Sequence, residues 1–569
     1  MHTPRVVLIG AEYEENLALR YLAASVANTG FVSEIIPFNT ANDLDNVVER
    51  VLAADPLVAG ISAPFQLRAR ELLSMARVLR ERGFGGHIAV GGHFATFEYA
   101  NILRDFPAVD SVVRHEGEGP FAWICGRVRD GLPVTAHSGV VVRGNGGIEV
   151  GPAHELPPLD ELPFPDRRGE PRNVLGIPSA PLIGSRGCYA DCSFCCIYAY
   201  HKAARGPRYR RRSPESVVAE MSGLYHERGV RLFVFEDDNF FLPAVGANIA
   251  RYERFAELLS EEGMTDIGLV IKCRPNDVDR GLFELLKSIG LVRAYVGIET
   301  NSGEGIVSLN RRISSEDNRR ALRVLSDLEI YSSFNVLIFD PEATLDGVTQ
   351  NLDFLEAHAD VPFNFCRAEV YAGTPLKRIL ESQRRLRGDY LGWDYEMRDP
   401  RVELLFRMML IAFNRRNFDF RGVHNLNMGI RFNLEVVRRF FPAVWAPSLH
   451  DRAVSASVAI GKDSVDHMRR ALDFCRNNDP YDGTRVNRFA LDLARAVAAS
   501  DFRFIAELKR LRRTVEMQLS SERGRPEGRS ARAVTAPILA SSLGGELSAE
   551  ALPAPARMRT PTDLKGGPA

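Results

Sequence analysis

The first 121 residues alternate short apolar runs with longer stretches in which apolar residues recur at helical spacing. The apolar runs are rich in Val, Ile and Leu, which is typical of parallel strands covered on both faces of a sheet. Strand and helix patterns therefore alternate and predict a doubly wound, Rossmann-like α/β domain. The predicted strands are Arg5–Ile9, Val32–Ile36, Leu57–Ile61, His87–Val90 and Ser111–Arg114, and the predicted helices are Asn16–Asn28, Leu44–Ala53, Arg68–Arg82 and Tyr99–Arg104.

The same alternation returns in residues 176–385. Its strand–helix units predict a partial (β/α)6 barrel of the TIM type. In such barrels the functional side chains lie on the loops that follow the strands, so these loops are the expected location of a site. The predicted strands are Pro181–Ser185, Leu232–Phe235, Gly268–Ile271, Arg293–Gly297, Ser333–Ile338 and Asn364–Val370.

Three further segments have other patterns. Residues 122–175 combine a predicted hairpin at Gly139–Val150 with the proline-rich stretch Leu156–Pro165, which predicts an extended connector. Residues 521–569 are rich in Gly, Pro, Ser, Ala and Arg, which predicts a disordered tail without a role in catalysis. Residues 386–520 follow a helical pattern, with predicted helices at Val402–Asn414, Leu434–Phe440, Ser464–Arg476 and Arg488–Leu519.

Composition narrows the function classes. A chain of 569 residues with 45% hydrophobic and 25% charged residues is typical of a soluble protein of several domains. The formal net charge of −1 gives no support to a nucleic-acid partner. We find no signal peptide at the amino terminus and no apolar run long enough for a membrane span. Eight cysteines do not form a secreted disulfide framework here, so we expect a reducing cytoplasm.

The most specific motif is Cys188-Tyr-Ala-Asp-Cys192-Ser-Phe-Cys195, a C-x3-C-x2-C spacing. Three thiolates can hold three irons of a 4Fe–4S cluster and leave the fourth iron open, unlike the four cysteines of ferredoxins. Zinc is the alternative, because His201 could complete a Cys3His set. The barrel pattern that follows the cysteines favours the cluster. Cys196 does not belong to the motif and is expected to pack.

The strand ends of the amino-terminal domain exclude two common ligands. Gly10 is followed by acidic residues instead of G-x-G-x-x-G, which argues against a dinucleotide. The third strand ends in Gly60-Ile-Ser62 without the aspartate of a phospho-acceptor domain. Small or polar residues remain at these ends and leave space for a bulky ligand: Ser62, Gly91, Gly92, His93, Thr96, Glu116 and Gly117.

Together these features resemble the cobalamin-dependent radical S-adenosylmethionine enzymes, across about residues 1–385. The resemblance implies three cofactors, namely a 4Fe–4S cluster on Cys188, Cys192 and Cys195, S-adenosylmethionine on the open iron, and cobalamin at the strand ends given above. The cobalamin signature D-x-H-x-x-G is absent, so that motif places no histidine below the cobalt.

The resemblance also implies residues that bind S-adenosylmethionine at the barrel strand ends. Acids after the second strand would accept hydrogen bonds from its amino group, and a helix N-terminus with acidic residues is the alternative. An arginine after the third strand would pair with its carboxylate, with a surface arginine as the alternative. A glutamate after the fourth strand would contact the ribose. An aromatic residue before the third cysteine would lie against the adenine, unless it only packs. These residues are Glu236, Asp237, Asp238, Arg274, Glu299 and Phe194.

Two other features of the sequence can be interpreted. We interpret the basic run Arg205–Arg212 as a solvated loop near the phosphate or amides of cobalamin, with RNA binding as the alternative. The segments Asp389–Tyr395 and Asn425–Gly429 are predicted to cover the site, because aromatic and amide groups suit a small polar metabolite.

The function that the resemblance implies is methylation of an unactivated carbon of a small molecule, with a peptide as the alternative substrate. A cobalamin-dependent rearrangement or cyclisation without methyl transfer is the second hypothesis, and a zinc-stabilised binding protein is a third from a different class. A methylthiotransferase is disfavoured because only Cys125 precedes Cys188. The expected partner is an electron donor such as flavodoxin or ferredoxin, with no nucleic acid and no membrane. No conventional acid–base pair was found among the residues.

Overall fold

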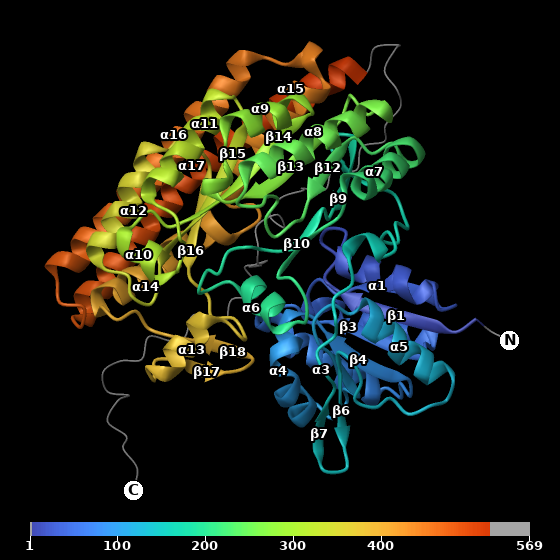
Figure 1. Cartoon of the computed structure of the whole chain (residues 1–569). Coiled ribbons are helices and arrows are strands. Elements are labelled where there is room, and N and C mark those ends of the chain that lie inside the picture. Colours follow the sequence, from blue (N-terminus) through green and yellow to red (C-terminus); the bar gives the residue numbers. More distant parts are fainter. Residues whose placement is uncertain (1–2, 524–569) are drawn as a thin grey trace, which may run out of the picture.

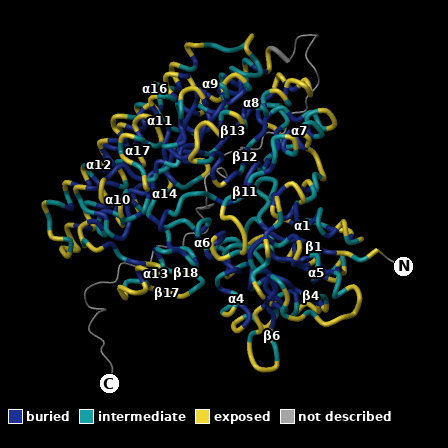
Figure 2. The backbone as a smooth tube through the Cα atoms, viewed as in Figure 1, coloured by how far each residue is buried: buried dark blue, intermediate teal, exposed yellow. Residues whose placement is uncertain are grey.

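The computed structural model of the chain describes residues 3–523. Figure 1 shows an amino-terminal α/β domain in blue, a second sheet in green and yellow, and carboxy-terminal helices in orange and red along that sheet. In Figure 2 the buried residues concentrate in the strands of both sheets. The predicted tail from residue 524 onward lies outside the described residues. Among the described residues, no helix has the length and apolar character of a membrane span.

The amino-terminal sheet has the order β2-β1-β3-β4-β5-β6-β7, and β1 to β5 are parallel. This order confirms the doubly wound class, whose ligands bind beyond the carboxyl ends of the strands. Apolar strand residues pack helices on both faces in two separate cores. The strands are β1 Arg5–Gly10, β2 Val32–Pro37, β3 Val58–Ser62, β4 His87–Gly91 and β5 Ser111–Val113, and the helices are α1 Leu17–Ala27, α2 Leu44–Ala54, α3 Ala69–Glu81, α4 His93–Asp105 and α5 Glu118–Arg129.

Two predicted boundaries differ in the structure. The helix predicted from Tyr99 starts at His93, because Gly92 has a φ of 114° and turns the chain directly from β4 into α4. The hairpin predicted in the connector forms β6 (Val140–Gly144) and β7 (Gly147–Val150), and it extends the amino-terminal sheet. The buried apolar side chains at the start of β6 explain this pairing. The segment boundaries themselves stay predictions.

The second sheet has the order β16-β15-β14-β13-β12-β9-β8 and does not close on itself, as a partial barrel requires. Neighbouring strands from β9 to β16 are parallel, and β8 is antiparallel at the edge. The first predicted strand is displaced: β9 ends at Leu182, and a short β10 (Ser185–Gly187) pairs with β11 (Tyr209–Arg211). The other strands are β8 Arg172–Val174, β9 Ile177–Leu182, β12 Leu232–Phe235, β13 Gly268–Cys273, β14 Leu291–Glu299, β15 Tyr331–Phe339 and β16 Phe363–Arg367.

Helices connect these strands and cover the sheet. The apolar faces of these helices and of the strands share one large core. The barrel helices are α6 Cys196–Ala203, α7 Pro214–Arg228, α8 Val245–Glu261, α9 Arg280–Ser288, α10 Gly303–Ser308, α11 Ser315–Asp327, α12 Leu345–Ala357 and α13 Pro375–Ser382.

Four long helices follow a small hairpin, β17 (Arg387–Asp389) and β18 (Gly392–Asp394). The predicted helices are confirmed as segments of longer ones. Phe432 and Val436 of the second helix pack against Leu232 and Tyr331 at the amino ends of the strands, which places this helix at the end opposite to the expected site. The helices are α14 Pro400–Phe418, α15 Val423–Phe440, α16 Pro447–Asn477 and α17 Gly483–Arg523.

Candidate functional site

The cysteine motif lies on the loop between β10 and α6, after the first strand of the barrel. Neighbouring elements fix this loop through its backbone: Ser193 N–H donates to the Leu309 carbonyl at 3.0 Å, and Leu376 N–H donates to the Ser193 carbonyl at 2.8 Å. Cys192 is buried, and Cys188 and Cys195 are half-buried. The loop is therefore held between the end of α10 and the start of α13.

The thiols lie in an environment that disfavours the free thiolate. Burial raises the pKa of Cys188 to about 11 and that of Cys195 well above its usual range. Metal ligation requires thiolates, so positive charge must come from the bound group or from nearby residues. Two arginines supply such charge at Cys192, and the soft sulfur donors suit an iron–sulfur group.

Among residues 3–523, no group of three or more His, Cys, Asp and Glu side chains is arranged around a single metal ion. The Cys3His set with His201 is therefore not formed in this structure. A 4Fe–4S cluster spreads its three cysteines over three different irons, so their sulfur atoms need not converge on one ion. Cys196, which the motif excludes, is buried at the start of α6.

Arg311 is the residue that the sequence did not reveal. Its Nη1 donates to Cys192 Sγ at 3.1 Å, its Nη2 donates to the Gly297 carbonyl, and its side chain is buried. The only signal in the sequence was the pair of adjacent arginines, Arg311 and Arg312, which is usual for a solvated surface. Positive φ angles at Asn310 and Arg312 turn the chain so that Arg311 points inward.

Arg274 lies beside it, after β13. Its Nη1 donates to Cys192 Sγ at 3.2 Å, its Nη2 to the Arg311 carbonyl at 2.5 Å and its Nε to Asn276 Oδ1 at 3.3 Å. The alternative of a surface arginine is wrong, because this side chain is buried. Pairing of Arg274 with a cofactor carboxylate stays a prediction.

The three acids after β12 have different partners. Asp237 is buried and accepts hydrogen bonds from Gly184 N–H at 2.9 Å and from the Ser185 hydroxyl. These bonds end β9 and start β10, so the role of Asp237 in this structure is to hold the backbone. Glu236 forms an ion pair with Lys272 at 2.5 Å, and its Oε1 is buried without a partner.

Asp238, the third acid, is exposed and accepts from Gly187 N–H at 2.9 Å. Glu299 ends β14 with a φ of 63°, and burial raises the pKa of its carboxyl although Arg311 and Arg274 lower it. This carboxylate accepts no hydrogen bond from the residues that the structure describes, so it keeps its accepting capacity. Phe194 is half-buried against the barrel core.

The predicted cobalamin-binding residues lie together at the strand ends of the amino-terminal domain. Ser62 ends β3 and Gly91 ends β4. A Cβ atom at Gly92 would lie 2.7 Å from the Ala63 carbonyl oxygen, so the close approach of these two strand ends requires glycine. The Thr96 hydroxyl donates to the Gly92 carbonyl at 2.9 Å and accepts from His115 N–H at 2.8 Å, and Thr96 is fully buried.

Aromatic rings from both domains meet at this edge. The ring of His93 stacks on Phe65 at 6.1 Å and lies 4.1 Å from Tyr200, which belongs to α6 directly after the cysteines. His115 has a φ of 63°, and both of its ring nitrogens are buried without a partner. Burial lowers the pKa of His93 and of His115 to about 4. Neutral rings and unpartnered nitrogens fit a ligand rich in amide groups, such as cobalamin. Tyr371 after β16 lies 5.6 Å from Phe65.

Glu116, which was predicted to bind cobalamin, forms ion pairs within the protein. Arg186 Nη1 donates to its Oε2 at 2.7 Å, and Arg210 donates to its Oε1. Both oxygens therefore already bind arginines of the barrel. Gly117, the next residue, faces Leu22 of α1.

The basic run Arg205–Arg212 is not simply a solvated loop. Its arginines at positions 210 and 212 are buried, and Arg212 Nη1 lies 2.5 Å from Glu220 of α7. Acids from α7 and from the loop after β5 compensate these charges, which the local sequence could not indicate.

Of the two segments predicted to cover the site, Asn425–Gly429 lies elsewhere, whereas a covering role for Asp389–Tyr395 stays a prediction. Asn425–Gly429 belongs to α15, and Tyr331 at the amino end of β15 donates to the Met428 carbonyl at 2.9 Å. This is the end of the barrel opposite to the cysteines. Tyr390 of the β17–β18 hairpin donates to Asp105 at 2.9 Å, so the hairpin rests on α4 of the amino-terminal domain.

Two family models match the chain: the B12 binding domain over residues 5–124 and the radical SAM superfamily over residues 182–355. The chain is 26% identical over 367 residues to an uncharacterised methyltransferase of Pyrococcus horikoshii, which spans 63% of this chain and 77% of that protein. It is 26% identical over 339 residues to the anaerobic magnesium-protoporphyrin IX monomethyl ester cyclase of Rubrivivax gelatinosus, which spans 56% of this chain and 58% of that one.

Among solved structures, the cobalamin-dependent S-adenosylmethionine radical enzyme OxsB, with aqua-cobalamin and S-adenosylmethionine bound, has a TM-score of 0.65. The match covers 91% of this chain and 81% of OxsB at 17% identity, so it shows a shared fold.

Proposed function

Because the chain belongs to the cobalamin-dependent radical S-adenosylmethionine enzymes, we propose that it methylates an unactivated carbon of a small-molecule metabolite. Its cofactors are a 4Fe–4S cluster, S-adenosylmethionine and cobalamin. When bound, they supply reductive cleavage of S-adenosylmethionine and transfer of the methyl group. Similarity to a methyltransferase of Pyrococcus horikoshii supports methyl transfer.

One observation carries this proposal: the helix that follows the cysteines lies directly against the ligand edge of the amino-terminal domain. The rings of Tyr200 and His93, one from each side, are 4.1 Å apart. A reaction that uses both cofactors on one substrate needs both sites at one interface, and this packing supports such an arrangement. The rings of Phe65, Tyr200 and Tyr371 are aromatic groups at this contact, which favours exclusion of water around a reactive radical.

We assign roles to the side chains on this basis. Cys188, Cys192 and Cys195 hold the cluster. Glu236 and Asp238 accept from the amino group of S-adenosylmethionine, and Glu299 from its ribose. Asp237 helps to position Glu236 and Asp238, because it fixes the Gly184 backbone. Arg274 pairs with the carboxylate, and Phe194 packs on the adenine.

On the cobalamin side, Ser62, Gly91, Gly92 and His93 line the corrin site. Thr96, Glu116 and Gly117 shape the same edge through their contacts within the protein. A flavodoxin or ferredoxin supplies electrons, and the reducing cytoplasm is the proposed location.

A radical cyclisation without methyl transfer is the second candidate. Similarity to the magnesium-protoporphyrin cyclase of Rubrivivax gelatinosus favours it, because that protein is named for ring formation. The two candidates share the cluster and the barrel and differ in whether a methyl group is transferred to the substrate.

An anaerobic assay tests the proposal. The protein is reconstituted with iron, sulfide and cobalamin, S-adenosylmethionine and a strong reductant are added, and 5′-deoxyadenosine and S-adenosylhomocysteine are quantified. We expect both products from the wild type and from Cys125→Ala, whose thiol is buried in α5 outside the motif, and neither from Cys192→Ala. Formation of 5′-deoxyadenosine alone would transfer the assignment to the cyclisation. Absence of both products in protein that holds cluster and corrin would reject both candidates.

A further inference from the structure

A buried set of ion pairs joins the amino-terminal domain to the strand that leads into the cysteine loop. Arg186 of β10 binds Glu116 at 2.7 Å through Nη1 and Glu118 at 2.6 Å through Nη2. Arg210 of β11 binds the other oxygen of Glu116, and its Nη1 donates to the Pro157 carbonyl at 2.5 Å. We call these four charged residues the interdomain lattice.

Removal of one charge of the lattice is expected to lower the stability of the protein, because all four side chains are largely buried. The side chains of Arg186 and Glu116 are 14% and 7% exposed, and those of Arg210 and Glu118 are 7% and 11% exposed. Arg186 and Arg210 are direct cross-strand partners in the β10–β11 pair, where like charges repel. The two carboxylates compensate that repulsion, and removal of one partner from a buried ion pair is strongly destabilising.

The pKa of Glu118 and a cation–π contact of Arg186 are consistent with strong attraction between the two domains. Burial raises the pKa of Glu118, but the charge and hydrogen bond of Arg186, the backbone hydrogen bond and the charge of Arg210 together outweigh burial, so the pKa is lowered. The Arg186 guanidinium also lies over the ring of Tyr21 in α1, 4.8 Å from its centroid. Arg186 therefore contacts the amino-terminal domain through three side chains.

The lattice is connected to the cysteines by a very short segment. Arg186 precedes Cys188 by two residues, and the intervening Gly187 has a φ of 87°. A Cβ atom at Gly187 would overlap the Arg208 carbonyl oxygen, and the Gly187 N–H is held by Asp238 at 2.9 Å. This link has little freedom, so a displacement of Arg186 moves Cys188 with it.

On the other side, the acids continue the ligand edge of the amino-terminal domain. Glu116 directly follows His115, whose N–H is held by Thr96 at 2.8 Å, and Glu118 opens α5. This short loop therefore carries the unpartnered ring of His115 at its start, and its two glutamates bind the arginines of the barrel.

We propose that Glu116 and Glu118 are positioning residues that set the distance between the cluster and cobalamin through Arg186 and the loop beginning at Cys188. This inference rests on the proposed function for the two bound groups, and it adds the element that fixes their spacing.

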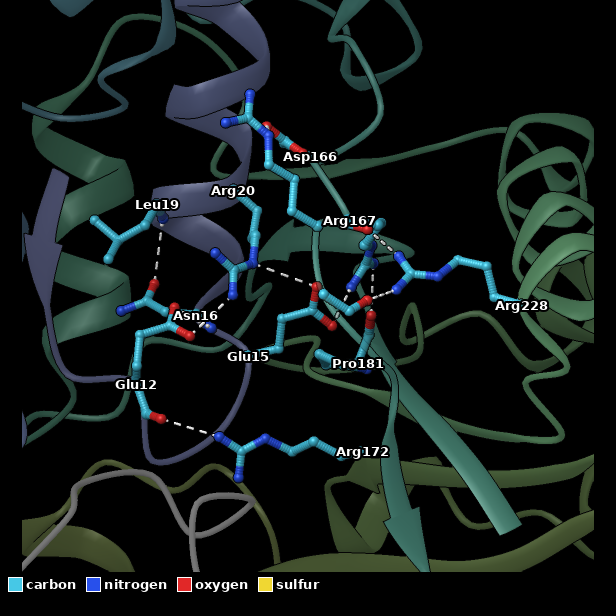
Figure 3. A network of polar contacts seen from close by, with 12 residues as sticks. Glu12, Glu15, Asn16, Leu19, Arg20, Asp166, Arg167, Arg172, Pro181 and Arg228 are labelled. Carbon is cyan, nitrogen blue, oxygen red and sulfur yellow. Dashed lines mark hydrogen bonds and ion pairs between the residues drawn. The ribbon is translucent and has the colours of Figure 1, made fainter. Parts of the chain in front are cut away.

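A second buried network provides a matched control. Arg167 of the connector binds Glu15 at 2.9 Å and Glu220 at 2.7 Å, and Figure 3 shows it beside Glu15 and Pro181. It also joins the two domains through buried charges, but it does not contact β10. Glu15→Gln therefore removes an interdomain ion pair of similar burial without touching the link to Cys188.

The experiment compares Glu116→Gln/Glu118→Gln with Glu15→Gln in protein loaded with iron–sulfur cluster and cobalamin. Pulsed electron paramagnetic resonance measures the distance distribution between cob(II)alamin and the reduced cluster, and iron and cobalt contents are measured on the same samples. We expect a shifted or broadened distribution only in the double variant, measured on the protein that retains both iron and cobalt. An unchanged distribution in the double variant would overturn the inference.

Two further measurements keep the test decisive. Arg186→Lys retains the charge but loses the two-pronged contact, and it should broaden the distribution if the double variant does not fold. Hydrogen exchange of the apoprotein should be several-fold faster at residues 188–195 in the Arg186 variant than in Glu15→Gln, and equal rates would overturn the inference. If the wild type binds neither the cluster nor cobalamin, the proposed function fails. The exchange comparison still tests the inference in that case, because it uses the apoprotein.

Discussion

Arg311 donates a hydrogen bond of 3.1 Å to the Sγ atom of Cys192 from a position 119 residues further along the chain. Arg274 donates to the same sulfur at 3.2 Å from a different loop. The middle cysteine of the motif thus receives two guanidinium groups in a buried environment, whereas the described residues give no such contact to the other two thiols of the motif. Hydrogen bonds to the sulfur ligands are among the factors that set the potential of an iron–sulfur cluster.

The substitution Arg311→Gln should therefore lower the reduction potential of the cluster, because it removes a donor that stabilises the more negative reduced state. The apoprotein should also lose about 2 kcal/mol of unfolding free energy with this charged hydrogen bond. A redox titration monitored by electron paramagnetic resonance measures the first effect and denaturant unfolding the second. Arg319→Gln, on the exposed face of α11, is the control and should change neither. A potential equal to that of the wild type in the Arg311 variant would contradict the prediction.

The placement of the cysteines was predictable, and the partners of Cys192 were not. Strand and helix periods predicted a loop after the first barrel strand, and the motif falls there. Arg311 and Arg186 meet partners that are 119 and 70 residues away, and no local pattern carries that information. A buried arginine cannot be told from a solvated one in the sequence. The basic run Arg205–Arg212 was therefore interpreted as a solvated loop, although Arg210 and Arg212 are buried.

Some of the missed detail was available from simple geometry. Successive residues of an extended chain point in opposite directions, so Glu236 and Asp237 could not both face the same site. The structure pairs Glu236 with Lys272 and turns Asp237 to the Gly184 backbone. By contrast, the addition of the β6–β7 hairpin to the first sheet depends on a long-range pairing that the hairpin pattern alone does not specify.

Gly373 tests how tightly the last barrel loop rests on the amino-terminal domain. It has a φ of 75°, and a Cβ atom there would lie 2.4 Å from the ring of Phe97 in α4. Gly373→Ala should cost about 1–3 kcal/mol from backbone strain alone, and it should weaken cobalamin retention because α4 begins at His93. Thermal unfolding and cobalt content after gel filtration check both effects. Gly246→Ala, in the first turn of α8 with open space around it, should leave cobalt content unchanged and raise stability slightly. Equal behaviour of the two variants would show that the contact with Phe97 does not constrain the loop.

Glu435 provides a pH dependence that is separate from the site. This residue of α15 is 7% exposed, and burial raises the pKa of its carboxyl from 4.5 to about 6 although Arg438 and Arg431 oppose the shift. The native state therefore binds the proton more tightly than the unfolded chain does. The stability that this protonation contributes is complete below pH 4.5 and is lost as the pH rises through about 6.

The isosteric change Glu435→Gln removes this titration, so the difference in unfolding free energy between variant and wild type should move in favour of the variant by about 2 kcal/mol between pH 4 and pH 8. Urea unfolding at a series of pH values measures that difference, and the common titration of all other groups cancels in it. Glu507→Gln, at a side chain that is 38% exposed on α17, serves as the control for the substitution itself. A flat profile for Glu435→Gln would mean that the carboxylate is as well stabilised in the folded protein as in water, and that Arg438 and Arg431 fully offset its burial.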